Sequence, residues 1–102
     1  MIHVIAIITA KPGMRDAILT EFHANMPAVH AEKGCIEYGP AIDADGIGSF
    51  QAKFGPDAFV VIEKWERPDA LKAHAASPHM AAYAAKTRDM IASRVIHVLQ
   101  PG

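Results

Sequence analysis

Residues 2–9, IHVIAIIT, decide the fold of this chain, because almost every position in them is apolar. In an extended strand, alternate side chains point to opposite faces of the sheet. One face would carry Ile2, Val4, Ala6 and Ile8, and the other His3, Ile5, Ile7 and Thr9. A strand with one solvated face alternates apolar and polar residues, and this strand does not. We therefore expect both of its faces to be largely covered.

Two later segments share this two-sided apolar pattern. Residues 57–65, DAFVVIEKW, and residues 94–99, RVIHVL, are mostly apolar at both odd and even positions. They are expected as the third and fourth strands. The second strand is expected at residues 35–43, CIEYGPAID, where Gly39-Pro40 is typical of an edge strand or a bulge.

A helical pattern follows the break at Lys11-Pro12-Gly13. Its apolar side carries Met14, Ala17, Ile18, Phe22, Met26 and Val29. Pro27 has no backbone N–H, so it is expected to kink or break this helix near Phe22–His23. Gly34 is expected to stop the helix.

The second half of the chain predicts two more helical segments after a long connection. Residues 44–56 contain three glycines and a proline, and their Phe50 and Phe54 need a surface to pack on. One helix is expected over Pro68–Ala76, and Ser77-Pro78 is expected to cap the next. The apolar line of that last helix is Met80, Tyr83, Ala84, Thr87 and Ile91.

The order of these elements predicts an α+β fold of the ferredoxin-like βαββαβ type, as a single domain over residues 1–102. Helices would cover one face of a four-stranded antiparallel sheet and leave the other bare. The chain is 51% hydrophobic, so that bare face would be apolar and larger than a monomer's usual exposed patch. We therefore expect a homodimer that packs sheet to sheet through this face.

Charge and composition exclude several classes of partner. The formal net charge is −1, from 10 basic and 11 acidic residues that are mixed along the chain, so nucleic acid is not expected. No apolar stretch approaches the roughly 20 residues of a membrane span, and no signal peptide is evident. With one cysteine and no export signal, a cytoplasmic location is expected.

Several short motifs resemble those of the antibiotic biosynthesis monooxygenase family. Residues 32–38, EKGCIEY, match the pattern E-x-G-C-x-x-Y, and residues 63–66, EKWE, match E-x-W-E. Residues 70–74, ALKAH, with 77–80, SPHM, resemble A-L-x-x-H…S-P-H-F, and residues 6–13 match A-x-x-x-x-K-P-G. The resemblance implies a dimeric α+β barrel. It also implies relatives that oxidise phenols and quinols with O2, beside isomerases, haem-degrading enzymes and proteins of no known activity.

Seven residues are candidates for the site. His74 is the first choice for a catalytic base, because an imidazole titrates near neutral pH and can take a phenolic proton. Glu63 is expected to orient a catalytic group, since an unpaired carboxylate on an apolar strand face is costly. The predicted substrate-binding residues are Trp65, Tyr38, Tyr83, His79 and Met80. Each of the seven has an alternative role in packing or in structural hydrogen bonding, and packing is the more common role for Trp65, Tyr38 and Tyr83.

No metal or organic cofactor is expected. No two of the six histidines have the i, i+4 spacing of a zinc-binding helix, and no glycine-rich phosphate loop precedes a helix. Ile7 stands near the point where haem-degrading relatives have an asparagine, which argues against haem chemistry.

Three functions remain open at the level of sequence. The first is a cofactor-independent monooxygenase of a small aromatic phenol or quinol, with O2 as co-substrate. The second is a protein that binds a small hydrophobic metabolite without turnover. The third is an isomerase of a small carbonyl compound, which needs only proton transfer and could use His74 with Glu63.

Overall fold

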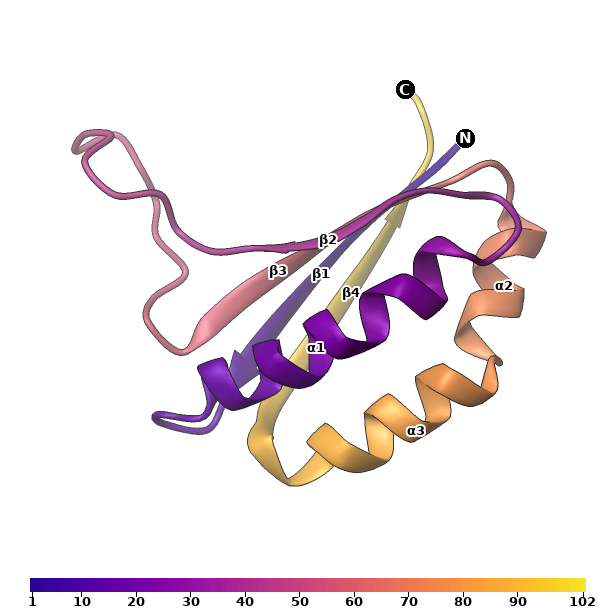
Figure 1. Cartoon of the computed structure of the whole chain (residues 1–102). Coiled ribbons are helices and arrows are strands. Elements are labelled where there is room, and N and C mark those ends of the chain that lie inside the picture. The colour runs from indigo at the N-terminus through magenta and orange to yellow at the C-terminus, as the bar shows by residue number, and fades with distance from the viewer.

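The computed structural model describes residues 1–102 and has four strands and three α-helices (Figure 1). Their order is β1 (Ile2–Ala10), α1 (Arg15–His30), β2 (Cys35–Ala41), β3 (Ala58–Trp65), α2 (Pro68–Ala75), α3 (Pro78–Thr87), the short 3-10 helix η1 (Arg88–Met90) and β4 (Ile91–Leu99). The predicted ferredoxin-like βαββαβ arrangement is confirmed, with its second helical element divided into α2 and α3.

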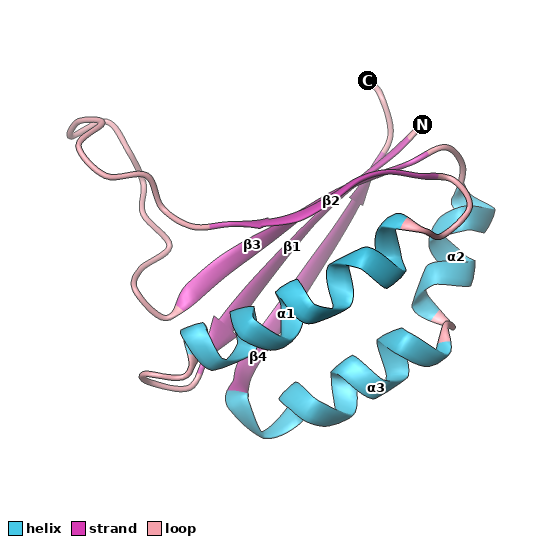
Figure 2. Cartoon of the chain, viewed as in Figure 1, coloured by secondary structure: helices cyan, strands magenta, loops and turns pink.

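The four strands form one antiparallel sheet in the order β2-β3-β1-β4. Ile5 in the centre of β1 lies opposite Ile62 of β3 and His97 of β4. All three α-helices lie on one side of the sheet (Figure 2). This placement divides the sheet into a helix-covered face and an open face.

The core lies between the helix-covered face and α1. Strand β1 contributes buried Val4, Ala6, Ile8 and Ala10, and β3 contributes Phe59, Val61 and Trp65. Phe22 of α1 stacks on Tyr38 of β2, with ring centroids 5.0 Å apart, and meets Phe59 edge-on at 6.0 Å. Aromatic contacts of this kind combine large apolar burial with a preferred geometry, so they fix α1 on the sheet.

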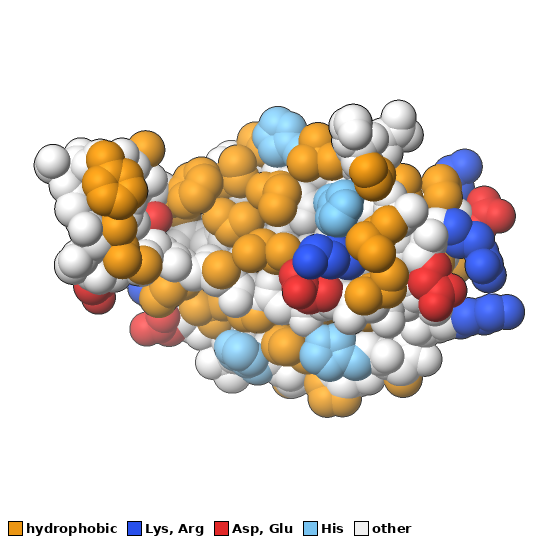
Figure 3. Space-filling view, turned by 90° about the horizontal axis from the view of Figure 1, so that it is seen from above, with side chains coloured by type: hydrophobic (Ala, Val, Ile, Leu, Met, Phe, Trp, Pro, Cys, Tyr) orange, Lys and Arg blue, Asp and Glu red, His pale blue; other side chains and the backbone are white.

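The open face carries the strand side chains that point away from the helices. Ile5, Ile62 and Val95 share this face. The register places them on adjacent strands, and along each strand they alternate with the residues that face the helices. Figure 3 looks onto this face and shows apolar side chains across its centre. An ion pair between Lys64 and Glu37, 3.9 Å long, is among the few charged groups there. The predicted apolar character of both sheet faces is therefore confirmed.

Helix α1 corrects two predictions. Of the predicted kink or break near Phe22–His23, the break is wrong, because the chain remains helical across Pro27. One lost backbone hydrogen bond is outweighed by the burial of Phe22 and Val29 against the sheet. The helix also ends at His30 rather than at Gly34. Gly34 is needed instead in the following turn: its φ is +85°, and a Cβ there would lie 2.7 Å from the Cβ of Ala70.

Two strand boundaries differ from prediction by more than one residue. Strand β2 ends at Ala41 rather than Asp43, and β4 begins at Ile91 rather than Arg94. Ile91 was predicted on the last helix because it continues the apolar spacing of that helix. In the structure α3 ends at Thr87, and η1 leads directly into the strand that begins at Ile91. A helical periodicity thus continued by chance across a change of element.

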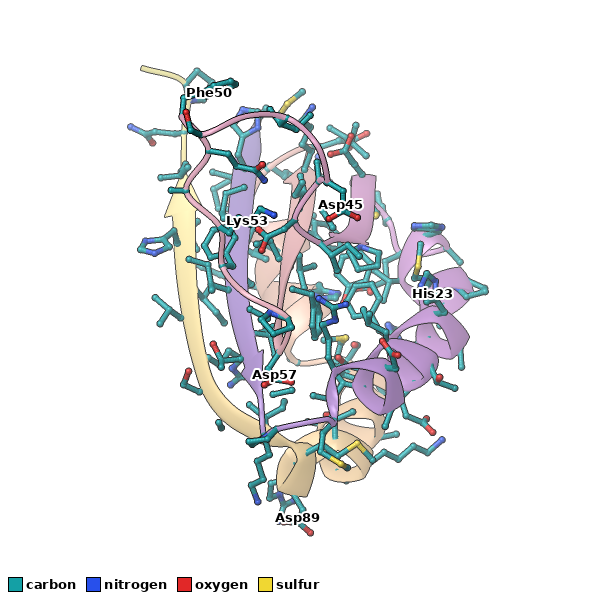
Figure 4. All side chains as sticks on the ribbon, turned by 90° about the vertical axis from the view of Figure 1, so that its left-hand side faces the viewer. His23, Asp45, Phe50, Lys53, Asp57 and Asp89 are labelled. Atoms are coloured by element: carbon teal, nitrogen blue, oxygen red, sulfur yellow. The ribbon has the colours of Figure 1, made fainter.

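The connection between β2 and β3 projects from one end of the sheet (Figure 1). The carboxylate of Asp43 accepts hydrogen bonds from the backbone N–H groups of Phe54 (3.0 Å) and Gly55 (2.8 Å) and so closes its base. Phe50 is 84% exposed and lies on the far side of the sheet from the helices (Figure 4). Neither Phe50 nor Phe54 is buried within the chain.

The structure has no helix with the length and apolar character needed to cross a membrane.

Candidate active site

A buried polar cluster lies where β3 meets α2. Glu63 and Trp65 are two positions apart on β3 and therefore point to the same, helix-covered face. The indole Nε1–H of Trp65 donates a hydrogen bond of 2.9 Å to Oε1 of Glu63. The imidazole of His74, from α2, lies against the indole, with ring centroids 4.7 Å apart. Three of the predicted site residues are thus brought together, and all three are buried.

Glu32 completes this cluster and was not among the predicted site residues. It lies in the turn between α1 and β2, and its Oε2 accepts hydrogen bonds from His74 Nδ1 (2.8 Å) and His79 Nε2 (2.9 Å). Ser77 does not cap α3 with its side chain; its hydroxyl donates to the carbonyl of His74 at 2.8 Å. The motif E-x-G-C-x-x-Y at residues 32–38 contained the signal for Glu32.

The Glu32 carboxylate determines which nitrogen of His74 is free. A carboxylate only accepts hydrogen bonds, so Nδ1 of His74 must carry the proton. In the neutral imidazole, Nε2 is then the acceptor, and it has no hydrogen-bond partner within the chain. A buried histidine oriented by a carboxylate, with its other nitrogen free, is the arrangement of a general base.

Burial sets the ionisation of the neighbouring groups. Desolvation raises the pKa of Glu63 above its ordinary value, although the hydrogen bond from Trp65 and the charge of His74 oppose this. Desolvation likewise raises the pKa of Tyr38, and Glu63 adds to the effect. The pKa of Cys35 is raised by burial and by the charges of Glu32 and Glu63, so its thiol stays protonated. A protonated thiol is a poor nucleophile, so this environment makes Cys35 unreactive.

A pocket of about 450 Å³ lies between the sheet and helices α1 and α3, next to the start of β4. Its lining consists of Ile8, Phe22, Tyr38, Val61, Tyr83, Ala84, Thr87, Arg88, Ile91, Ala92, Ser93 and Arg94. The predicted substrate-binding residues Tyr38 and Tyr83 are therefore part of one pocket. Its volume is in the range of small-molecule sites.

The other predicted site residues do not line this pocket. Glu63, Trp65 and His74 lie behind Tyr38, whose ring meets His74 at a centroid distance of 5.4 Å and stacks on Phe22 on the pocket side. Tyr38 thus joins the polar cluster to the pocket. Its hydroxyl has no hydrogen-bond partner within the chain.

His79 and Met80 face a different surface. His79 contributes to a smaller hollow of about 120 Å³ between α1 and α3. The sulfur of Met80 accepts a hydrogen bond from Nδ2 of Asn25 at 3.4 Å, and its side chain packs against the core. These two residues join α3 to α1 and to Glu32, and neither borders the larger pocket.

The cluster also contains a set of possible metal donors. One ligand atom from each of Glu32, His74 and His79 lies within 4.8 Å of the others. Two imidazoles and a carboxylate can hold a transition metal. Here the same oxygen of Glu32 already accepts a hydrogen bond from each imidazole, so the polar atoms are satisfied by one another.

Comparisons with known proteins agree with this fold over its whole length. The family model described as "Antibiotic biosynthesis monooxygenase" matches residues 1–86. A protein of Escherichia coli strain K12, described as "Probable quinol monooxygenase YgiN", is 40% identical over 104 residues, which cover 100% of this chain and 99% of that protein.

Solved structures give the same result. Rv0793 from Mycobacterium tuberculosis is 28% identical with a TM-score of 0.79, covering 98% of this chain and 93% of that one. PA3566 from Pseudomonas aeruginosa is 26% identical with a TM-score of 0.79, covering 98% and 92%. The chain therefore belongs to the antibiotic biosynthesis monooxygenase family.

Proposed function

We propose that this protein oxidises a small phenol or quinol with O2, without a metal or an organic cofactor. Family membership and the 40% identity to the E. coli protein support a monooxygenase. The aromatic substrate is supported by the pocket, because Phe22, Tyr38 and Tyr83 supply flat apolar walls of the kind that aromatic ligands pack against.

The observation that carries this proposal is the buried pair of Glu32 and His74 directly behind Tyr38. The free Nε2 of His74 would remove the proton of the substrate hydroxyl, and Glu32 would hold the imidazole in the required tautomer. Tyr38 lines the pocket and its ring contacts that of His74, whereas His74 itself does not line the pocket, so the transfer requires the substrate hydroxyl to reach past the Tyr38 ring.

The chemistry needs no external reductant. Removal of the proton leaves an electron-rich phenolate that passes one electron to O2, and the resulting radical pair combines to form a carbon–oxygen bond. The peroxide anion of this adduct takes the proton back from His74. Loss of water from the resulting hydroperoxide yields the quinone, so one oxygen atom enters the product and the other leaves as water. The substrate supplies all the electrons, and exclusion of bulk water from the pocket protects the intermediate.

The experiment is oxygen uptake by the purified protein with a panel of benzene and naphthalene quinols. His74→Ala should lower kcat by about 100-fold or more, the usual contribution of a general base. His23→Ala is the matched control, because His23 is an exposed histidine on α1 outside the site. An unchanged rate in His74→Ala would remove His74 from the mechanism. No uptake with any quinol, together with ligands that raise Tm, would favour a binding protein without turnover.

We also propose that two copies of the chain pack through the open face of the sheet. Apolar side chains of β1, β3 and β4 cover this face, and a monomer would leave them in water. The connection that bears Phe50 projects to the same side of the sheet (Figure 4), so Phe50 could contact the second copy. A two-fold interface of this kind is self-complementary, since each copy offers the same face.

A further inference from the structure

The mouth of the 450 Å³ pocket carries two positive charges. Arg88, from η1, and Arg94, from β4, both line the pocket and are both exposed residues, so their side chains lie toward its open side. Arg94 lies opposite Ile8 in the β1–β4 register, and Ile8 is part of the buried pocket wall. The side chain of Arg94 therefore leaves the sheet on the face that holds the pocket.

Neither arginine has a carboxylate partner. The ion pairs of the chain involve other residues, and no aspartate or glutamate lines the pocket. The positive charge of Arg94 acts on the hydroxyl of Tyr83, whose pKa burial nevertheless raises to about 12. Glu21, which also acts on Tyr83, is paired with Lys86 at 3.8 Å. The pocket thus has two unpaired cations in a chain whose formal net charge is −1.

We propose that this pocket binds an aromatic substrate that bears an anionic substituent, and that Arg94 and Arg88 bind that substituent. The aromatic ring would lie on the apolar wall formed by Phe22, Tyr38 and Val61, and the anion would point to the pocket mouth. A guanidinium binds a carboxylate or sulfonate through two parallel hydrogen bonds, so it selects for a planar or tetrahedral anion as well as for charge. The aromatic part of this inference depends on the proposed function; the anionic part depends on the arginines alone.

The probes are 2-naphthol and 2-naphthol-6-sulfonate, which differ by one sulfonate group that carries a permanent negative charge. Their binding is followed by their own fluorescence without O2, so that the proposed oxidation cannot occur. The sulfonate should bind about tenfold more tightly than 2-naphthol, as expected for one charge-assisted contact at a partly exposed site. Raising the salt concentration should weaken the binding of the sulfonate and leave that of 2-naphthol nearly unchanged.

Variants separate the arginines from general effects of charge. Arg94→Gln should remove most of the preference for the sulfonate, Arg88→Gln should reduce it, and Arg94→Lys should restore part of it. Arg67→Gln is the matched control, because Arg67 is exposed and lies before α2, outside the pocket. Circular dichroism checks that each variant is folded.

The outcomes distinguish this inference from the proposed function. Equal affinity for the two probes, or a preference that survives in both Arg94→Gln and Arg88→Gln, would overturn it. If the preference is present but no quinol is oxidised, the anion site stands and the monooxygenase proposal fails. If quinols are oxidised without any preference for an anionic substituent, the monooxygenase proposal stands and the anion site is overturned.

Discussion

At the scale of single residues, the site depends on one carboxylate oxygen that accepts two hydrogen bonds. Oε2 of Glu32 holds both His74 and His79, which come from different helices. It therefore orients the proposed base and ties α2 and α3 to the end of α1. The hydrogen bond from Nδ1 to this carboxylate sets the tautomer of the imidazole, so Glu32 is a positioning residue for the proposed base.

Glu32→Gln should therefore lower kcat for quinol oxidation by about 10-fold or more, which is part of the contribution of about 100-fold or more expected of a general base. An amide keeps the shape of the side chain and one acceptor oxygen, but it has no negative charge to stabilise the imidazolium formed during the reaction. Glu37→Gln is the control, since Glu37 lies on the open face of the sheet and pairs with Lys64. The proposed role of Glu32 is wrong if Glu32→Gln, like the control Glu37→Gln, keeps the kcat of the unchanged protein.

Glu63 predicts a dependence of stability on pH. Burial raises its pKa above the ordinary value of 4.5, so the folded protein holds this proton more tightly than the unfolded chain does. The resulting stabilisation is complete below the ordinary pKa and is lost as pH rises through the raised pKa. Each unit of raised pKa corresponds to roughly 1.4 kcal/mol.

Glu63→Gln removes this ionisation and keeps an oxygen that can accept the hydrogen bond from Trp65. Its free energy of unfolding, relative to that of the unchanged protein, should therefore be higher at pH 8 than at pH 4. Urea unfolding of both proteins at the two pH values measures the difference. A difference that does not change with pH would show that Glu63 titrates normally in the folded state.

The sequence identifies some of these residues and misses others for a physical reason. His74 and Glu63 stand out because polar groups on apolar faces need partners. The partnership of Glu32 with His74 spans 42 positions and exists only because the turn after α1 packs against α2. The arginines of the pocket were missed because β4 begins at Ile91, which places Arg94 inside the strand and beside Ile8.

At the scale of elements, α1 shows how packing overrides a local rule. Pro27 interrupts the backbone ladder, yet the helix extends from Arg15 to His30, because Phe22 and Val29 are buried on either side of the proline. Element order and type were predictable from alternation and helical spacing. Element ends were not, since they depend on contacts between elements rather than on propensity.

Pro27→Ala should stabilise the protein. Proline inside a helix lowers the free energy of unfolding by about 3 kcal/mol, but it also restricts the unfolded chain, which raises that free energy by up to about 1 kcal/mol. Replacing it with alanine should therefore raise the free energy of unfolding by about 2 kcal/mol. Pro27 is exposed, so the substitution leaves the core unchanged. Urea unfolding at a fixed protein concentration gives the value. Equal or lower stability would mean that the helix has adapted to the proline at no cost.

At the scale of the whole molecule, the sheet has two apolar faces and the chain covers one of them. Val95 and Ile96 are neighbours on β4 that are 49% and 52% exposed, and they point to opposite faces. Val95 belongs to the open face, where we propose the second copy packs. Ile96 belongs to the helix-covered side.

Val95→Lys should therefore convert a dimer into a monomer, whereas Ile96→Lys should not. A lysine within a sheet-to-sheet interface would leave a buried charge without a partner. Light scattering at micromolar protein concentration distinguishes the two states. A monomeric unchanged protein, or dissociation caused equally by both substitutions, would contradict the proposed interface.

In the proposed reaction, this chain inserts one atom of O2 into an aromatic substrate. The most direct measurement is mass spectrometry of the quinone formed under oxygen-18 gas by protein treated with a chelator. The predicted product carries one heavy oxygen, and His74→Ala forms it at a strongly reduced rate. A quinone without heavy oxygen, formed while O2 is reduced to peroxide, would contradict the claim.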